Sequence, residues 1–126
     1  MAARIHVVDD DESMRELIRM HLEAAGYEVV LAEDAVVAGY SLLRSPPDLI
    51  LCDVNMPHMT GFEFVAAIKA DRTVPDVPVV FLTSEEDSDD HAKALGAVGY
   101  LIKPVRVERL LSTVAKHVAG GTFPIG

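Results

Sequence analysis

This chain of 126 residues has one cysteine, few basic residues and no long hydrophobic run. With Cys52 alone, no disulfide can form within the chain. Only 11 lysine and arginine residues stand against 20 acidic ones, a net charge of −9. This charge argues against direct binding to nucleic acids or anionic membranes, which rely on basic contacts to phosphate. No apolar run approaches the ~20 residues that span a bilayer, and no signal peptide opens the chain, so we expect a cytoplasmic protein without membrane insertion.

The composition is that of an ordinary globular domain, with half of the residues apolar and a quarter charged. The length predicts one domain that buries roughly two-thirds of its unfolded surface. Neither internal repeats nor low-complexity segments interrupt it. We expect this domain over residues 1–119, and the Gly/Pro-rich residues 120–126 to form a flexible tail or the start of a linker.

Apolar runs typical of strands alternate five times with helical patterns. Such alternation predicts right-handed crossovers and a parallel sheet with helices on both faces, while a closed barrel would need about twice the length. The predicted fold is α/β: a doubly wound, five-stranded parallel sheet in a three-layer (βα)5 sandwich. The predicted strands are 4–8, 28–32, 49–53, 79–82 and 99–102, and the predicted helices lie at about 13–25, 34–45, 62–70, 85–95 and 107–118.

Two helices have recognisable start signals. Ser13 and the glutamate three residues later have capping-box spacing at the start of the first helix. Asp34 can cap the second helix. Its apolar stripe is predicted to include Val37, Tyr40 and Leu43.

Polar side chains stand at four of the predicted strand ends. Asp9 and Asp10 follow the first strand, Asp53 ends the third, Thr83 the fourth, and Lys103 the fifth. In a doubly wound sheet these ends share one edge, where ligands bind. Crowded carboxylates take up protons unless a cation joins them, and hard oxygen ligands favour Mg²⁺. A lysine and a hydroxyl beside that ion can stabilise a phosphoryl group, with one carboxylate as the nucleophile.

Simpler interpretations exist for each residue. Acidic residues after a strand often cap the next helix, a threonine there is often a turn residue, and a lysine before proline is often solvated. His58 is expected to be an exposed loop residue, because imidazole is a poor ligand for Mg²⁺. Cys52 is expected to be buried on the face opposite to Asp53. His6, inside the first strand, is expected to have its nitrogens satisfied in the core or at the sheet edge.

The segments Val7–Arg15, Asp53–Gly61, Phe81–Ser84 and Gly99–Pro104 resemble the receiver domain of two-component response regulators. The resemblance extends from about residue 4 to 118 and implies a flavodoxin-like fold. It also implies a phosphoacceptor switch, rather than an enzyme, that promotes its own phosphorylation and dephosphorylation in a phosphorelay. The implied partners are a sensor histidine kinase or histidine phosphotransfer protein, and an unknown downstream protein.

The resemblance also implies which residues do the chemistry. Asp53 corresponds to the phosphoacceptor. The Mg²⁺ ligands correspond to Asp10, Asp53 and the backbone carbonyl of Asn55, with Asp9 holding the ion through water. Lys103 corresponds to the lysine that pairs first with the acidic cluster and then with the phosphoryl oxygens.

Two further positions correspond to the conformational switch. Thr83 matches the hydroxyl that turns inward to the phosphoryl group, and Tyr100 matches the aromatic residue that swings inward with it. Asn55 and Glu85, two residues after the acceptor and after the switch threonine, are both polar and predict a labile acyl phosphate.

The sequence departs from the family between Thr83 and Lys103, where the spacing of 20 residues is shorter than usual. This predicts a short fourth helix over residues 85–95, or one partly unwound at its acidic start.

Two other classes of function stay open. One is a Mg²⁺-dependent phosphohydrolase with an aspartyl nucleophile, and the other is a binding module that is never phosphorylated.

Overall fold

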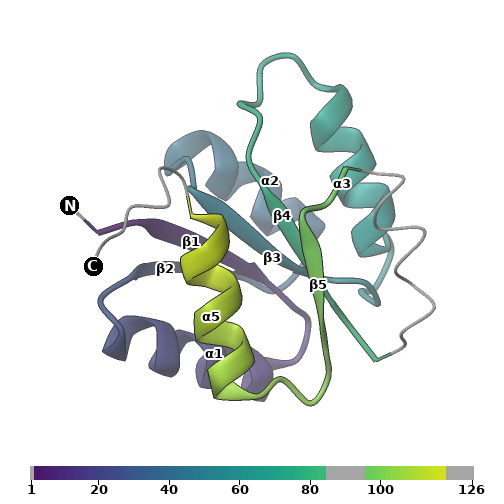
Figure 1. The fold of residues 1–126 in the computed structure, drawn as a ribbon. Helices are drawn as coiled ribbons and strands as arrows, with labels where there is room; N and C mark the ends of the chain where they lie inside the picture. Colours follow the sequence, from purple (N-terminus) through teal and green to yellow (C-terminus); the bar gives the residue numbers. More distant parts are fainter. Residues whose placement is uncertain (1, 85–95, 119–126) are drawn as a thin grey trace.

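The computed structural model describes residues 2–84 and 96–118, and Figure 1 shows strands and helices alternating from β1 to β4, as predicted for that part of the chain. The helix predicted over residues 85–95 and the tail over 120–126 lie outside the described residues. In the described part of the chain, no helix combines the length and apolar character needed to cross a membrane. The elements are β1 (Arg4–Val8), α1 (Glu12–Ala24), β2 (Glu28–Ala32), α2 (Ala35–Arg44), β3 (Leu49–Asp53), α3 (Gly61–Ala70), β4 (Val79–Thr83), β5 (Gly99–Ile102) and α5 (Val107–His117).

The five strands form one parallel sheet in the order β2-β1-β3-β4-β5. The predicted doubly wound, flavodoxin-like architecture is therefore confirmed. From β1 the chain first moves outward to β2 and then returns to β3 on the other side of β1. Ligands of such sheets bind at the carboxyl ends of the strands where the order reverses, which here is the edge above β1 and β3.

The core consists of two apolar layers, one on each face of the sheet. Side chains of α1 and α5 pack on one face, and side chains of α2 and α3 pack on the other; Figure 1 shows α5 in front of the sheet and α2 behind it. The central strands β3 and β4 are buried along their whole length, as expected for parallel strands covered on both faces. Burial on both sides holds the strand ends, and hence the side chains on them, in fixed positions.

The start of α1 differs from the prediction. The helix begins at Glu12, and its cap is Asp11, whose carboxylate accepts hydrogen bonds from the amides of Ser13 and Met14. Ser13 lies inside the first turn instead of capping it. A carboxylate satisfies the free amides and also meets the positive end of the helix dipole, so it is at least as good a cap as serine. At α2 the predicted cap, Asp34, is confirmed.

The buried face of α2 also differs from the prediction. The helix buries Ala38 and Leu42 against the sheet, whereas Tyr40 and Leu43 are 68% and 64% exposed and Val37 is 38% exposed. Apolar residues occur almost all the way around this helix, so their spacing does not select one face. The small Ala38 side chain allows α2 to lie close to the sheet, and this contact decides which face is inward.

Candidate functional site

Two buried aspartates stand side by side at the carboxyl ends of β1 and β3. Asp9 directly follows β1 and Asp53 is the last residue of β3, and the pairing of Val8 with Cys52 sets the two carboxylates next to each other. Both side chains are almost inaccessible, with Asp9 at 0% and Asp53 at 3% exposure. Because burying a carboxylate is costly without a cationic partner, both residues require compensation.

Lys103 supplies this compensation from the edge strand β5, which is separated from β3 by β4. It directly follows β5, and its Nζ lies 3.0 Å from Asp9 Oδ2 and 3.1 Å from Asp53 Oδ1. The side chain therefore passes the end of β4 to reach β1 and β3. The interpretation of this lysine as a solvated residue is wrong, since it is ion-paired to both buried carboxylates.

The charges in this cluster shift the pKa values of Asp53 and Lys103. Burial, together with the neighbouring charge of Asp9, raises the pKa of Asp53 to about 6, although Lys103 acts in the opposite direction. Burial by itself lowers the pKa of Lys103, but the ion pairs with Asp9 and Asp53 outweigh it and raise that pKa above its ordinary value. The site thus has a permanent cation and an excess of carboxylates.

The carboxylate excess fits a divalent cation. Asp9, Asp10 and Asp53 each offer a carboxylate oxygen, and these oxygens lie within 4.8 Å of one another. Asp10 is exposed, so a cation could approach from solvent. Asp9 Oδ2 has no hydrogen-bond partner within the described residues and forms an ion pair with the ammonium of Lys103. An all-oxygen set open to water is what Mg²⁺ requires.

The turn after β1 holds Asp9 in place. Its Oδ1 accepts a hydrogen bond from the Asp11 amide at 2.9 Å, and its backbone carbonyl accepts one from Arg15 Nη1 at 2.7 Å. Sequence reasoning missed Arg15. The available signal was its position one turn into the helix that follows the acidic residues, where a long side chain can reach back to the turn.

The turn after β3 is built around the Asp53 backbone. The Asn55 amide donates to Asp53 Oδ1 at 3.3 Å, which places this peptide unit beside the carboxylate. The amide of Gly61, the first residue of α3, donates to the Val54 carbonyl at 2.8 Å. A Cβ at Gly61 would lie 2.0 Å from the Asp53 carbonyl oxygen, so only glycine fits. Sequence reasoning did not identify this requirement.

Thr83 and Tyr100 lie on neighbouring strands. Thr83 ends β4 and is buried, and its carbonyl accepts a hydrogen bond from the Lys103 amide at 2.7 Å. Tyr100 pairs with Phe81, two residues before Thr83. Tyr100 and Phe81 both belong to the apolar layer under α2 and α3, so the alternation of side chains places Thr83 on this face as well.

The other candidates lie where the sequence predicts. Cys52 is buried in the layer opposite to the Asp53 carboxylate, and burial raises its pKa, which keeps it an unreactive thiol. His58 is exposed in the turn after β3, with a positive φ of 70°. His6 is buried, and its Nε2 lies 2.6 Å from the Ser45 carbonyl, to which it donates a hydrogen bond.

Comparisons with known proteins agree with this geometry. The model of the response regulator receiver domain family matches residues 5–115, and the chain belongs to this family. The chain is 36% identical to the phosphate regulon transcriptional regulatory protein PhoB of Pseudomonas aeruginosa over 122 residues, which are 95% of this chain and 53% of that protein. It is 34% identical to the DNA-binding dual master transcriptional regulator RpaA of Synechocystis over 113 residues, 88% of this chain and 47% of that protein.

Solved structures show the same similarity. The chemotaxis response regulator CheY4 of Vibrio cholerae superposes with a TM-score of 0.87 at 38% identity, covering 94% of this chain and all of that one. This chain thus spans about half the length of the curated relatives and the full length of CheY4. Receiver domains are phosphorylated on an aspartate by histidine kinases, and this chain is a phosphoacceptor switch of that class.

Proposed function

We propose that Asp53 is the phosphoacceptor of this receiver domain. The observation that carries the proposal is the contact of Lys103 Nζ with Asp53 Oδ1 at 3.1 Å, at the edge of the sheet where the strand order reverses. Of the three clustered aspartates, only Asp53 comes from β3. Asp9 is held by Asp11, Arg15 and Lys103, which suits a supporting role rather than that of a nucleophile.

The proposed reaction transfers a phosphoryl group from a phosphohistidine. An oxygen of the Asp53 carboxylate attacks phosphorus, the phosphorus–nitrogen bond breaks, and the imidazole of the donor retains its electron pair and takes up a proton. The donor is a sensor histidine kinase or a histidine phosphotransfer protein. Lys103 exchanges part of its contact with the carboxylates for contacts with the phosphoryl oxygens, which stabilises the added negative charge.

The acidic cluster would hold Mg²⁺ for this reaction. Asp10, Asp53 and the backbone carbonyl of Asn55 would bind the ion directly, and Asp9 would bind it through water. When bound, the ion offsets charge on the transferring phosphoryl group. The chain's own contribution is the rigid placement of these oxygens, because Asp9 and the Asn55 peptide are fixed by hydrogen bonds.

We infer that Thr83 and Tyr100 transmit the signal. The Thr83 hydroxyl would turn toward the phosphoryl oxygens, and Tyr100 would move inward on the same face of the sheet. This change would alter the molecular surface next to the ends of β4 and β5, and a downstream protein partner would bind there. A local change in charge would thus bias a two-state element.

The test is phosphorylation of the whole chain with acetyl phosphate and Mg²⁺, followed by intact mass spectrometry. Wild-type protein is expected to gain one phosphoryl group, and Asp53→Asn none. Asp76→Asn is the matched control, because the Asp76 side chain is 91% exposed at the opposite end of the sheet. Labelling of Asp53→Asn to the wild-type extent would refute the assignment.

Loss of the phosphoryl group would occur by hydrolysis, in which water attacks phosphorus and the bond to Asp53 breaks. The positions of Asn55 and Glu85 in the sequence, two residues after Asp53 and two after Thr83, predict that their polar side chains orient that water. Glu85 lies outside the described residues. We expect Asn55→Ala to slow the loss of the phosphoryl group from the labelled protein. An unchanged rate of loss would contradict the role of Asn55 in orienting water. Steady-state release of phosphate from many small phosphomonoesters would instead favour the phosphohydrolase alternative.

A further inference from the structure

The outward face of α2 is apolar and has no partner within the described chain. We call its residues Val36, Gly39, Tyr40 and Leu43 the α2 surface. Val36, Tyr40 and Leu43 are 68%, 68% and 64% exposed. They border an open groove of about 390 Å³ between α2 and the end of α3, which Ile68, Asp71 and Val74 also line. Adjacent exposed apolar side chains that line a groove are a feature of protein interaction sites.

Gly39 adds an independent observation. A glycine inside a helix costs about 1 kcal/mol relative to alanine, so it needs a structural reason. Its φ is not in the left-handed region, and a Cβ built on it would meet no atom of the described chain within 4 Å. Nothing in the described chain therefore requires glycine here. The open space leaves room for the backbone of a second molecule to approach α2 closely at this position.

The charges around α2 indicate which molecule this is. The chain has a net charge of −9, so copies repel one another over most of their surface. The α2 helix, by contrast, has no charged residue before Arg44 at its end, and Glu33 and Asp34 precede its start. When two such helices pack antiparallel, Arg44 of each copy lies beside Glu33 and Asp34 of the other. The positive end of each helix dipole then lies beside the negative end of the other, which stabilises the pair. The surface is thus complementary to itself, as a two-fold interface must be.

We propose that the α2 surface binds the α2 surface of a second copy of this chain, with the helices antiparallel and Gly39 near the two-fold axis. The apolar area of three side chains is well below the ~800 Å² per partner of stable interfaces. The dimer is accordingly weak and reversible. It forms without phosphorylation, and it uses none of the residues assigned to the phosphoacceptor site.

Sedimentation equilibrium of the unphosphorylated chain from about 10 µM to about 1 mM tests this proposal. The weight-average mass of the wild type is expected to rise from monomer toward dimer. Tyr40→Glu should weaken association at least tenfold. Met20→Glu, at a residue 55% exposed on α1, is the matched control and should associate like the wild type. A wild type that stays monomeric throughout, or Tyr40→Glu that associates normally, would overturn the proposal.

Two further variants separate docking from folding. Gly39→Ala is expected to raise the thermal stability of dilute monomer while weakening the dimer several-fold, because the added methyl group keeps the helices apart. Arg44→Glu and Glu33→Lys should each weaken association, and their combination should restore it. An unweakened Gly39→Ala dimer, or a double charge reversal no better than the single ones, would contradict the antiparallel α2 pairing.

Discussion

At the scale of single residues, the electrostatics of the site depend on two buried carboxylates that share one ammonium. Asp9 and Asp53 together have more negative charge than Lys103 neutralises, and burial, together with the neighbouring charge of Asp9, raises the pKa of Asp53. The site is therefore destabilising for the folded chain when it holds no further cation. The same excess of charge favours binding of a metal ion, so function and stability are in conflict at this position.

The first prediction concerns Asp53→Asn in metal-free buffer. The folded-state pKa of about 6 exceeds the ordinary 3.8, so between these values the folded state binds more protons than the unfolded state, and wild-type stability falls as pH rises. Asparagine does not titrate. We expect the variant's advantage to be near zero at about pH 4 and to reach up to about 3 kcal/mol above pH 7. Urea unfolding followed by circular dichroism measures it, and equal stability of both proteins at pH 7 would contradict the prediction.

The second prediction concerns Arg15, which donates to the Asp9 carbonyl. Without this hydrogen bond the turn that presents Asp9 and Asp10 loses one of its fixed points. Arg15→Ala is expected to weaken Mg²⁺ binding by roughly 10-fold, the lower end of such outer-shell effects, and Arg15→Lys to restore part of it. Calorimetric titration with Mg²⁺ provides the measurement. Arg19→Ala, on the exposed face of the same helix, should bind Mg²⁺ like the wild type.

At the scale of elements, the turns that follow β1 and β3 place the chemistry. The turn after β1 is closed by Asp11, which caps α1 and donates its amide to Asp9. The turn after β3 leads into α3, where Thr60 and Glu63 form a capping box. Both helices therefore start at defined residues close to the site, and the start of α1 also orients the Asp9 carboxylate through the Asp11 amide.

The third prediction is that Gly61→Ala destabilises the fold. A methyl group would lie 2.0 Å from the Asp53 carbonyl oxygen, so either α3 or the end of β3 must move. We expect a loss of at least about 2 kcal/mol in unfolding free energy, together with slower phosphorylation. Gly39→Ala at micromolar concentration is the control, with a gain of up to about 1 kcal/mol. Comparable stability of the two alanine variants would show that α3 adjusts without cost.

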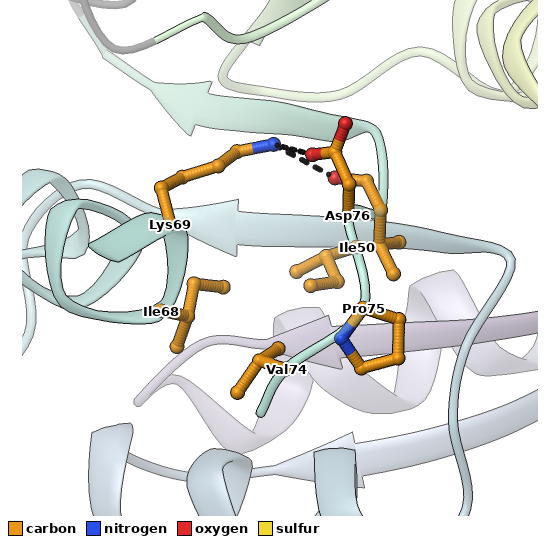
Figure 2. Close-up of a pocket in the computed structure, with 7 residues that line it drawn as sticks. Ile50, Ile68, Lys69, Val74, Pro75 and Asp76 are labelled. Atoms are coloured by element: carbon orange, nitrogen blue, oxygen red, sulfur yellow. Dashed lines mark hydrogen bonds and ion pairs between the residues drawn. The ribbon is translucent and has the colours of Figure 1, made fainter. Parts of the chain in front are cut away.

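At the scale of the whole molecule, the order of the strands gathers the site. Asp9, Asp53 and Lys103 come from three segments of the chain and meet because the strands that end beside them are parallel in one sheet. Thr83 ends the strand between β3 and β5, and its carbonyl bonds the Lys103 amide. The opposite end of the sheet has no such cluster of acidic residues in the described chain. There, Lys69 Nζ donates hydrogen bonds to the Asp76 carboxylate and to the Val77 carbonyl (Figure 2). These residues line a cavity of about 120 Å³. One edge therefore holds the proposed phosphoacceptor site, and at the other Lys69 ties α3 to the segment that leads into β4.

The fourth prediction is that Mg²⁺ stabilises the whole fold. A ligand that binds only the folded chain adds about 2.7 kcal/mol at a concentration one hundred times its dissociation constant. Millimolar Mg²⁺ should raise the melting temperature measured by circular dichroism, and NaCl of equal ionic strength should have a much smaller effect. Asp10→Asn should lose most of the specific increase. An equal response to both salts would mean that only general screening of the −9 charge is at work.

Much of the fold could be predicted because buried parallel strands are nearly continuous apolar runs. The runs at β2 and β5 have the predicted ends, and β3 includes Asp53 as predicted. The site could be predicted for a related reason: polar residues that directly follow such runs must lie at one edge of a parallel sheet. Local patterns were less informative at helix starts, where three consecutive aspartates before α1 offered several equivalent caps.

By itself, the sequence determined the order of the described elements, the approximate bounds of the strands, and the placement of the acidic residues and Lys103 on one edge. These follow from local periodicity and from the geometry of parallel strands. Tertiary structure alone decided which face of α2 is buried, that Arg15 reaches the Asp9 carbonyl, and that Gly61 must lack a side chain. Each of these depends on how closely two elements approach. That distance is set by the packing of the whole core, so it cannot be predicted from the spacing of residues along the chain.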